Sequence, residues 1–194
     1  MDERLQKQID FILEIDKSKN ILRQTHLTHH GRRENDAEHA WHMAIMAYLL
    51  QEYSNEKIDV AKVMLMLLIH DLVEIDAGDT YAYDNDGLKT QASREKKAED
   101  RLFSMLPADQ GQVLKALFEE FNAEQTPEAK FARVMDNFQP LLLNNSNDGM
   151  DWTGHDISAN QVYGRQNRSR PGSEKLFQIT NQIIKENIQK EKLK

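Results

Sequence analysis

Two adjacent ionisable residues, His70 and Asp71, directly follow an unbroken apolar run at residues 63–69. Such polar groups are costly in an apolar interior unless they are hydrogen-bonded, paired with a charge or bound to a metal. Glu74 follows His70 at a spacing of four residues, which places both side chains on one face of a helix. Nitrogen and oxygen donors gathered at one helix end indicate a divalent metal site, although a buried helix can also simply end on a His-Asp pair.

Two further ionisable residues stand beside apolar helical patterns elsewhere in the chain. His39 lies in the first turn of a helix that Asn35 and Glu38 are predicted to cap. Asp136 interrupts the apolar pattern of a later helix. Two imidazoles and two carboxylates suit Mn, Co, Zn, Fe or Ni better than Ca or Mg, so we predict one divalent transition metal. The predicted ligands are His39, His70, Asp71 and Asp136.

The composition indicates a globular protein. Its 194 residues are 39% hydrophobic and 29% charged, and length and composition together predict one domain over residues 1–194. No stretch reaches about 18 apolar residues, so no membrane-crossing segment is expected. No apolar signal-type segment follows residues 1–4, and the chain contains no Cys, which fits a reducing compartment. We therefore expect a cytoplasmic protein.

The charge of the chain argues against nucleic acid as a partner. Its 25 basic and 32 acidic residues give a net charge of −7. A nucleic-acid binder usually carries a broad positive surface, which this chain lacks. If the protein handles phosphates, the positive charge must be local and come from a metal or a few arginines.

Helical periodicity prevails along nearly the whole chain and predicts an all-α bundle. The helix starting after Asn35 is apolar on most of its circumference and is predicted to be largely buried. A central helix is predicted from Asp59 to Asp76, with Gly78 as its C-terminal cap. A terminal helix at about 173–190 packs on the core or on a partner subunit, and so offers a surface for a homodimer. Further helix starts are indicated at Thr126-Pro127, Ser158 with Gln161, and Ser173.

Three polar segments without sustained periodicity are predicted to be loops, at residues 20–34, 79–90 and 144–154. The first contains three arginines, whose guanidinium forks are suited to phosphate but equally serve as ordinary surface charges. These candidate substrate ligands are Arg23, Arg32 and Arg33. The same segment contains His26, His29 and His30. We do not favour a metal cluster there, because no acidic or Cys partner stands at ligand spacing. His42 is predicted to support the site or to serve packing.

The order of His39, the His70-Asp71 pair and Asp136 resembles the signature of the HD-domain metal-dependent phosphohydrolases. The most specific motifs are Glu-Asn-Asp-Ala-Glu-His at residues 34–39 and His-Asp-Leu-Val-Glu-Ile-Asp-Ala-Gly-Asp at residues 70–79. The resemblance extends over a core of about residues 21–143. It implies a compact single-domain bundle of the HD type. No His lies between His70 and His155, which within this family implies one metal rather than two.

These motifs look like those of the bacterial 5′-deoxynucleotidase branch and its eukaryotic relatives. In that branch the residues matching Glu74 and Asp79 serve catalysis, and an Arg matching Arg23 meets the substrate phosphate. The resemblance implies release of phosphate from a deoxyribonucleoside 5′-monophosphate. Gln24 departs from the bacterial pattern, in which an aromatic residue follows this Arg.

Two alternative functions remain at this point. One is another HD phosphatase, acting on nucleoside triphosphates or on a non-nucleotide monoester. The other is a non-catalytic helical scaffold that holds a metal. Glu74 and Asp79 argue against the scaffold, because a structural metal site needs no spare carboxylates beside its ligands.

Overall fold

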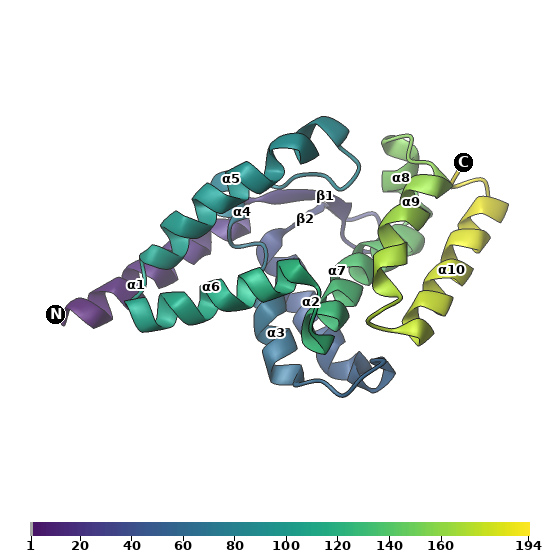
Figure 1. The fold of residues 1–194 in the computed structure, drawn as a ribbon. Coiled ribbons are helices and arrows are strands. Elements are labelled where there is room, and N and C mark those ends of the chain that lie inside the picture. Colours follow the sequence, from purple (N-terminus) through teal and green to yellow (C-terminus); the bar gives the residue numbers. More distant parts are fainter. Residues whose placement is uncertain (1) are drawn as a thin grey trace.

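A central helix, α7 (Pro127–Ser146), organises the fold (Figure 1). In the computed structural model, which describes residues 2–194 apart from the side chain of Asn85, the helices α2, α3, α6, α9 and α10 all pack against it. Thr126 caps its start by accepting a hydrogen bond from the Ala129 amide, and Pro127 occupies the first position, as predicted. Because most side chains of α7 are buried, this helix can present polar groups to an enclosed site.

The remaining elements confirm the prediction of a mainly helical fold. In chain order the other helices are α1 (Glu3–Ile15), α2 (Asp36–Leu50), α3 (Val60–Ile69), α4 (Glu74–Ala77), α5 (Asn85–Ser104), α6 (Ala108–Ala123), α8 (Met150–Gly154), α9 (Ala159–Gln166) and α10 (Glu174–Gln189). Short 3-10 turns are η1 (Asp16–Asn20), η2 (Gln51–Tyr53) and η3 (Asn167–Ser169). None of the helices within residues 2–194 has the length and hydropathy that a bilayer crossing requires.

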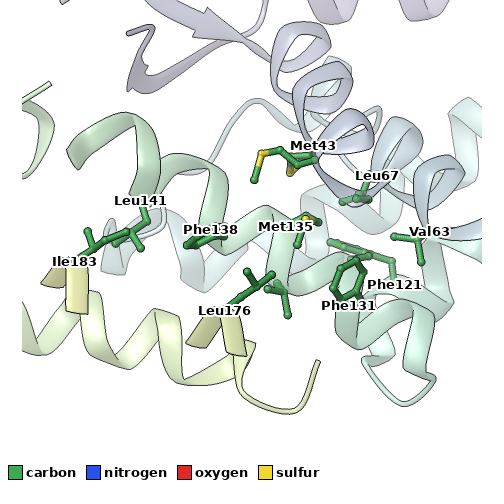
Figure 2. Packing of buried hydrophobic residues seen from close by; sticks show 14 of the residues in the cluster. Met43, Val63, Leu67, Phe121, Phe131, Met135, Phe138, Leu141, Leu176 and Ile183 are labelled. Atoms are coloured by element: carbon green, nitrogen blue, oxygen red, sulfur yellow. The ribbon is translucent and has the colours of Figure 1, made fainter. Parts of the chain in front are cut away.

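The hydrophobic core has two parts. The larger part lies between α2, α3, α7 and α10, where Met43, Leu67 and Met135 are fully buried (Figure 2). The smaller part lies between α1, α5 and α6. Leu176 and Ile183 of α10 belong to the larger part, so the terminal helix packs on the core of its own chain.

The segment at residues 20–34 is not a loop, contrary to the prediction. It contains the antiparallel strands β1 (Leu22–His26) and β2 (Arg33–Asn35), in which Leu22 pairs with Asn35 and His26 with Arg33. Strands this short show no recognisable alternation in sequence, and their pairing is a non-local property. The hairpin leads directly into α2, whose capping box of Asn35 and Glu38 forms as predicted.

The predicted central helix is interrupted at His70, the first of its ionisable candidate site residues. α3 ends at Ile69, and residues 70–73 form turns before α4 starts at Glu74. The Leu72 amide bonds to the Ile69 carbonyl and the Glu74 amide to the Asp71 carbonyl, which is a tighter pattern than in an α-helix. Gly78 then ends α4 with φ +73°, a conformation that glycine adopts without a Cβ penalty.

Three further predictions are corrected by the structure. The segment 144–154 is mostly helical, because α7 continues to Ser146 and α8 follows. Asn147 there is buried and donates to the His26 and Leu27 carbonyls, so polar residues in this segment tie the hairpin to α7. Within 79–90, α5 already starts at Asn85, with Asp84 as its N-cap. α2 is not buried all round, since its outer face is exposed to solvent.

Candidate metal centre and its cavity

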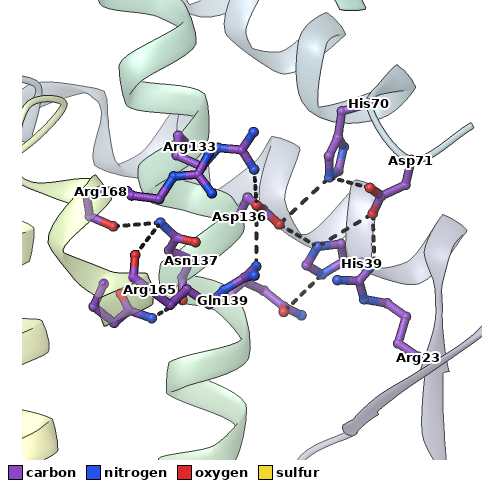
Figure 3. A network of polar contacts seen from close by, with 12 residues as sticks. Arg23, His39, His70, Asp71, Arg133, Asp136, Asn137, Gln139, Arg165 and Arg168 are labelled. Carbon is purple, nitrogen blue, oxygen red and sulfur yellow. Dashed lines mark hydrogen bonds and ion pairs between the residues drawn. The ribbon is translucent and has the colours of Figure 1, made fainter. Parts of the chain in front are cut away.

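Three separate elements bring the predicted metal ligands together (Figure 3). The first turn of α2 supplies His39, the end of α3 supplies His70, and α7 supplies Asp136. Asp71 lies in the turn that follows His70. His39, His70 and Asp136 are all buried, and each has a donor atom within 4.8 Å of the donor atoms of the other two.

The donor distances fit a shared ion. Asp136 Oδ1 lies 3.4 Å from His39 Nε2 and 3.8 Å from His70 Nε2. Ligand atoms that share an ion at about 2.1 Å stand about 3.0–4.2 Å apart in tetrahedral or octahedral geometry. Asp71 borders this group with both oxygens: Oδ1 is 2.9 Å from His70 Nε2, and Oδ2 is 3.9 Å from His39 Nε2.

Both imidazoles present the nitrogen that a metal needs. His70 Nδ1 lies 2.9 Å from the Leu67 carbonyl oxygen, which can only accept, so Nδ1 carries the hydrogen. The lone pair of a neutral His70 ring is therefore on Nε2, which is buried and faces the carboxylates of Asp71 and Asp136. A backing hydrogen bond of this kind fixes the tautomer and orientation of metal-binding histidines.

The ring of His39 is held in the same way by Gln139. His39 Nδ1 donates to Gln139 Oε1 at 3.0 Å, while Gln139 Nε2 donates to Glu34 Oε2 at 2.9 Å. The Glu34 carboxylate can only accept, and this fixes the orientation of the Gln139 amide. Gln139 Nε2 also lies 3.2 Å from His42 Nδ1. His42 thus contacts the residue that orients His39, and its predicted supporting role stays a prediction.

Two arginines hold the outer oxygen of Asp136. Arg133 Nη1 donates to Asp136 Oδ2 at 2.7 Å, and Arg165 Nη2 lies 3.5 Å from the same oxygen. Burial would raise the pKa of Asp136. The positive charge of Arg165 and the nearby rings of both histidines outweigh burial, and they hold this pKa well below its ordinary value. The inner oxygen, Oδ1, is thereby left as an anionic donor aimed at the imidazoles.

The metal-free arrangement favours a protonated His70. Burial opposes the charged ring, but the neighbouring Asp71 and Asp136 carboxylates outweigh burial and raise the pKa of His70 to about 10. Asp71 shows the converse effect: burial is outweighed by His70 and Arg23, so its pKa lies below the ordinary value. A cation at this position would therefore replace a proton on His70.

A second acidic group lies on the other side of Asp71. Asp36, Asp71 and Glu74 each have a carboxylate oxygen within 4.8 Å of the other two. Arg23 donates from Nη1 to Asp71 Oδ2 at 2.8 Å and to Asp36 Oδ1 at 3.5 Å. Burial, together with the charge of Asp71, raises the pKa of Asp36 to about 7 and the pKa of Glu74 well above its ordinary value. Glu74 Oε2 is buried and has no hydrogen-bond partner in the described chain.

A cavity of about 680 Å³ opens onto this group, within the usual range for small-molecule sites. Asp79 lines it as predicted, and burial raises the pKa of its carboxyl. The cavity wall also includes Arg23, His70, Asp71, Glu74, Tyr81, Tyr83, Arg133, Asp136 and Arg165. Metal-type donors, carboxyl groups of raised pKa and arginines therefore share one cavity.

The remaining candidates from the sequence lie elsewhere. Arg32 and Arg33 are exposed and do not line the cavity; Arg32 pairs with Glu38. His26 lies 2.5 Å from Asp151, and His30 contacts Met150. Within residues 2–194, the groups of close metal-type donors include none of the three histidines in the hairpin segment.

Several supporting residues were not found from the sequence. Gln139, Arg133 and Arg165 appear as ordinary polar residues on predicted helices, and their roles depend on contacts between distant elements. One signal was available, because Arg133 and Gln139 stand three residues before and after Asp136 on the same helix. Asp36 was visible as part of the capping segment, but nothing local connects it to Glu74.

Comparisons with known proteins agree with this geometry. The sequence profile of the HD domain matches residues 15–177. A crystal structure from Magnetospirillum magnetotacticum MS-1, described as a predicted metal-dependent phosphohydrolase, superposes with a TM-score of 0.95. It is 44% identical in sequence, and the match covers 99% of this chain and 96% of that one. A conserved hypothetical protein from Pyrococcus furiosus shares the fold at 20% identity, with a TM-score of 0.62 over 93% of this chain and 99% of that one.

Curated relatives match over a shorter segment. The human 5′-deoxynucleotidase HDDC2 is 28% identical over 111 residues, which are 57% of this chain and 53% of that protein. The Schizosaccharomyces pombe 5′-deoxynucleotidase hdd1 is 27% identical over 119 residues, covering 58% of this chain and 59% of that protein. The match thus spans little more than half the length of these relatives.

Proposed function

We propose, since this chain belongs to the HD domain family, that it is a metal-dependent phosphohydrolase that releases phosphate from deoxyribonucleoside 5′-monophosphates. The observation that carries this proposal is the pair of buried imidazoles whose Nε2 atoms face the Asp136 carboxylate beside a cavity. The spare carboxyl groups of Glu74 and Asp79 in the same cavity support hydrolysis rather than a purely structural ion.

In this proposal His39, His70, Asp71 and Asp136 hold one divalent transition metal. The mixed nitrogen and oxygen donors suit Mn, Co, Zn, Fe or Ni. When bound, such an ion polarises the phosphoryl group and lowers the pKa of a water in the site. Gln139 and the Leu67 carbonyl keep the two rings oriented, and Arg133 keeps the carboxylate of Asp136 aimed inward.

Glu74 is proposed to move the proton of the reaction. Its buried carboxyl has a pKa well above the ordinary value, because burial and the charge of Asp71 disfavour the ionised form, and a positioned carboxyl shifted in this direction can serve as a general acid or base. Glu74 can then take a proton from the attacking water or give one to the leaving 5′-oxygen. Asp79, whose pKa is also raised, lines the same cavity and can assist this transfer or hold the sugar.

Arg23 is proposed to offset the charge of the phosphate, together with Arg165. Both residues line the cavity, and in the absence of substrate Arg23 is paired with Asp71. An arginine fork matches two phosphate oxygens, so it can position the substrate and stabilise negative charge as it develops. Because Arg32 and Arg33 are exposed outside the cavity, they do not enter the proposal in this role.

The nucleotide part of the proposal is supported by two observations. The curated relatives are 5′-deoxynucleotidases. In the cavity itself, Tyr81 and Tyr83 lie edge to face with ring centroids 5.3 Å apart, and they offer aromatic surface for a base.

The proposal is tested by a phosphate-release screen with added Mn²⁺, Co²⁺, Zn²⁺ or Mg²⁺. The panel contains deoxyribonucleoside and ribonucleoside 5′-monophosphates, nucleoside 3′-monophosphates, nucleoside triphosphates and p-nitrophenyl phosphate. We expect the highest kcat/KM for a deoxyribonucleoside 5′-monophosphate. Preferred release of triphosphate from nucleoside triphosphates, or preference for a non-nucleotide ester, would assign the site to a different phosphatase. No turnover with any metal would leave a metal-binding scaffold.

A further inference from the structure

The neighbouring helices α2 and α3 contain almost no charged residues, although the rest of the chain contains many. Residues 39–51, which form most of α2, include no Asp, Glu, Lys or Arg, and α3 has Lys62 alone, although 29% of the whole chain is charged. α2 and α3 pack side by side, and α7 covers their inner sides (Figure 1). A helix that is apolar all round is normally buried on all sides.

The outer sides of these two helices are nevertheless exposed. On α2, Trp41 and Leu49 are each 63% exposed and Tyr48 is 58% exposed. Ile45 lies between them at four-residue spacing, so the side chains form one continuous stripe. On α3, Leu65 and Leu68 are exposed in the same way. We call these six side chains the α2–α3 face: Trp41, Ile45, Tyr48, Leu49, Leu65 and Leu68.

The size of this face is that of an interaction surface. With exposed fractions between 38% and 63%, its six side chains present about 600 Å² to solvent. A standard specific interface buries about 800 Å² on each partner, so the face supplies most of the area that a stable pair needs. Its composition also matches: the centres of interfaces are depleted in charge and enriched in Trp and Tyr.

We propose that the α2–α3 face is a dimer interface, buried against the same face of a second copy of this chain. An uncharged face offers no ion pairs with which to select a charged partner, whereas a two-fold axis places the same apolar patch on both sides of the interface. Two helix pairs brought together in this way form a four-helix arrangement with a continuous apolar centre. This interface lies at α2 and α3, and not at the terminal helix α10.

The proposed interface and the metal centre lie on opposite sides of the same helix, α2. The Trp41 ring lies 6.2 Å from the His42 ring, roughly parallel to it. His42 contacts Gln139, which orients His39. Dimer contacts on the outer side of α2 therefore restrain the same helix that carries a proposed metal ligand on its inner side.

The first test compares molar masses by light scattering after size exclusion, at about 20 µM chain. The variants are Leu49→Glu on the α2–α3 face and Val113→Glu on α6, a residue with similar exposure (57%) that is not part of the face. We expect the wild type and Val113→Glu to have twice the chain mass of 22.6 kDa. Leu49→Glu should be monomeric, with dimerisation weakened at least about 100-fold, because two carboxylates would be buried without partners. A monomeric wild type overturns the proposal.

The second test needs no variant and covers the case in which Leu49→Glu does not fold. The chain has two Trp residues, and Trp152 is only 3% exposed, so acrylamide quenching reports on Trp41. In the dimer we expect Trp41 to be protected, and dilution below the dissociation constant should make it quenchable. A dimer in which Trp41 is quenched as freely as an exposed indole places the interface elsewhere and overturns the proposal.

Discussion

Replacing Glu74 by Gln tests the proposed proton transfer with little disturbance of the structure. Glu74 is 7% exposed, and its pKa is raised well above the ordinary value by burial and by the charge of Asp71. The folded protein therefore favours the neutral carboxyl more than water does, and Gln matches this neutral form in shape and charge. We expect the midpoint of thermal unfolding to change little and the metal content to equal that of the wild type.

The expected loss of turnover follows from the role assigned to Glu74. A positioned general acid or base contributes about 10²- to 10⁴-fold to rate, or about 3–5 kcal/mol of barrier. The amide that Glu74→Gln introduces cannot exchange a proton in this way. Asp79 remains in the cavity as a carboxyl of raised pKa, so the lower end of this range is the expected minimum loss. We therefore expect kcat to fall at least about 100-fold, with a much smaller change in KM.

The assay is phosphate release from a deoxyribonucleoside 5′-monophosphate at saturating Mn²⁺ or Co²⁺, with metal content measured on the same samples. Glu95→Gln is the matched control: Glu95 also lines the cavity and its pKa is raised by burial, but it is not among the close metal-type donors of the described residues. We expect Glu95→Gln to keep kcat within about threefold of the wild type. A Glu74→Gln enzyme with wild-type kcat would show that Glu74 moves no proton in the reaction.

Three further predictions follow from the same contacts. Arg133→Ala removes the shorter of the two arginine contacts to Asp136 Oδ2, so we expect metal affinity to fall about 10- to 100-fold by titration calorimetry, whereas Arg170→Ala, which removes an exposed pair with Glu174, should leave it unchanged; equal affinities would refute the orienting role of Arg133. Arg23→Ala should raise KM at least tenfold and Arg32→Ala should not, which steady-state kinetics would decide. In the metal-free protein the pKa of Asp36 is raised to about 7 and that of His70 to about 10, so at these two groups the folded chain binds more protons than the unfolded chain between about pH 4 and about pH 10. The stability from Asp36 is then lost as pH rises through about 7 and that from His70 as pH rises through about 10, so the urea midpoint should be lower at pH 9 than at pH 5.5; a higher midpoint at pH 9 contradicts these shifts.

Local signals predicted the helices well. Caps such as Thr126 before α7 and the box of Asn35 and Glu38 before α2 depend on neighbouring residues alone, and both of them form. The hairpin β1–β2 and the buried polar residue Asn147 depend on contacts between segments far apart in sequence, which no local pattern contains. The outer face of α2 was misjudged for a related reason: an apolar helix indicates burial but not what buries it.

The residues of the site also differ in whether the sequence alone could predict them. The structure brings His39, His70 and Asp136 together, as the sequence predicted, because an ionisable group on an apolar helix face stands out from its neighbours. A charged residue in a polar segment does not differ from its neighbours in this way, so the sequence does not single it out. Arg23 and Arg32 looked alike in the sequence, yet one side chain lines the cavity and the other pairs with Glu38 at the surface.

The most direct measurement is anomalous diffraction from crystals grown with Mn²⁺. We expect one strong peak per chain, about 2.0–2.3 Å from His39 Nε2, His70 Nε2 and Asp136 Oδ1, with Asp71 as a further ligand. A peak between Asp36 and Glu74 in place of this one, or no peak near the two imidazoles at saturating Mn²⁺, would contradict a metal centre built on His39, His70 and Asp136.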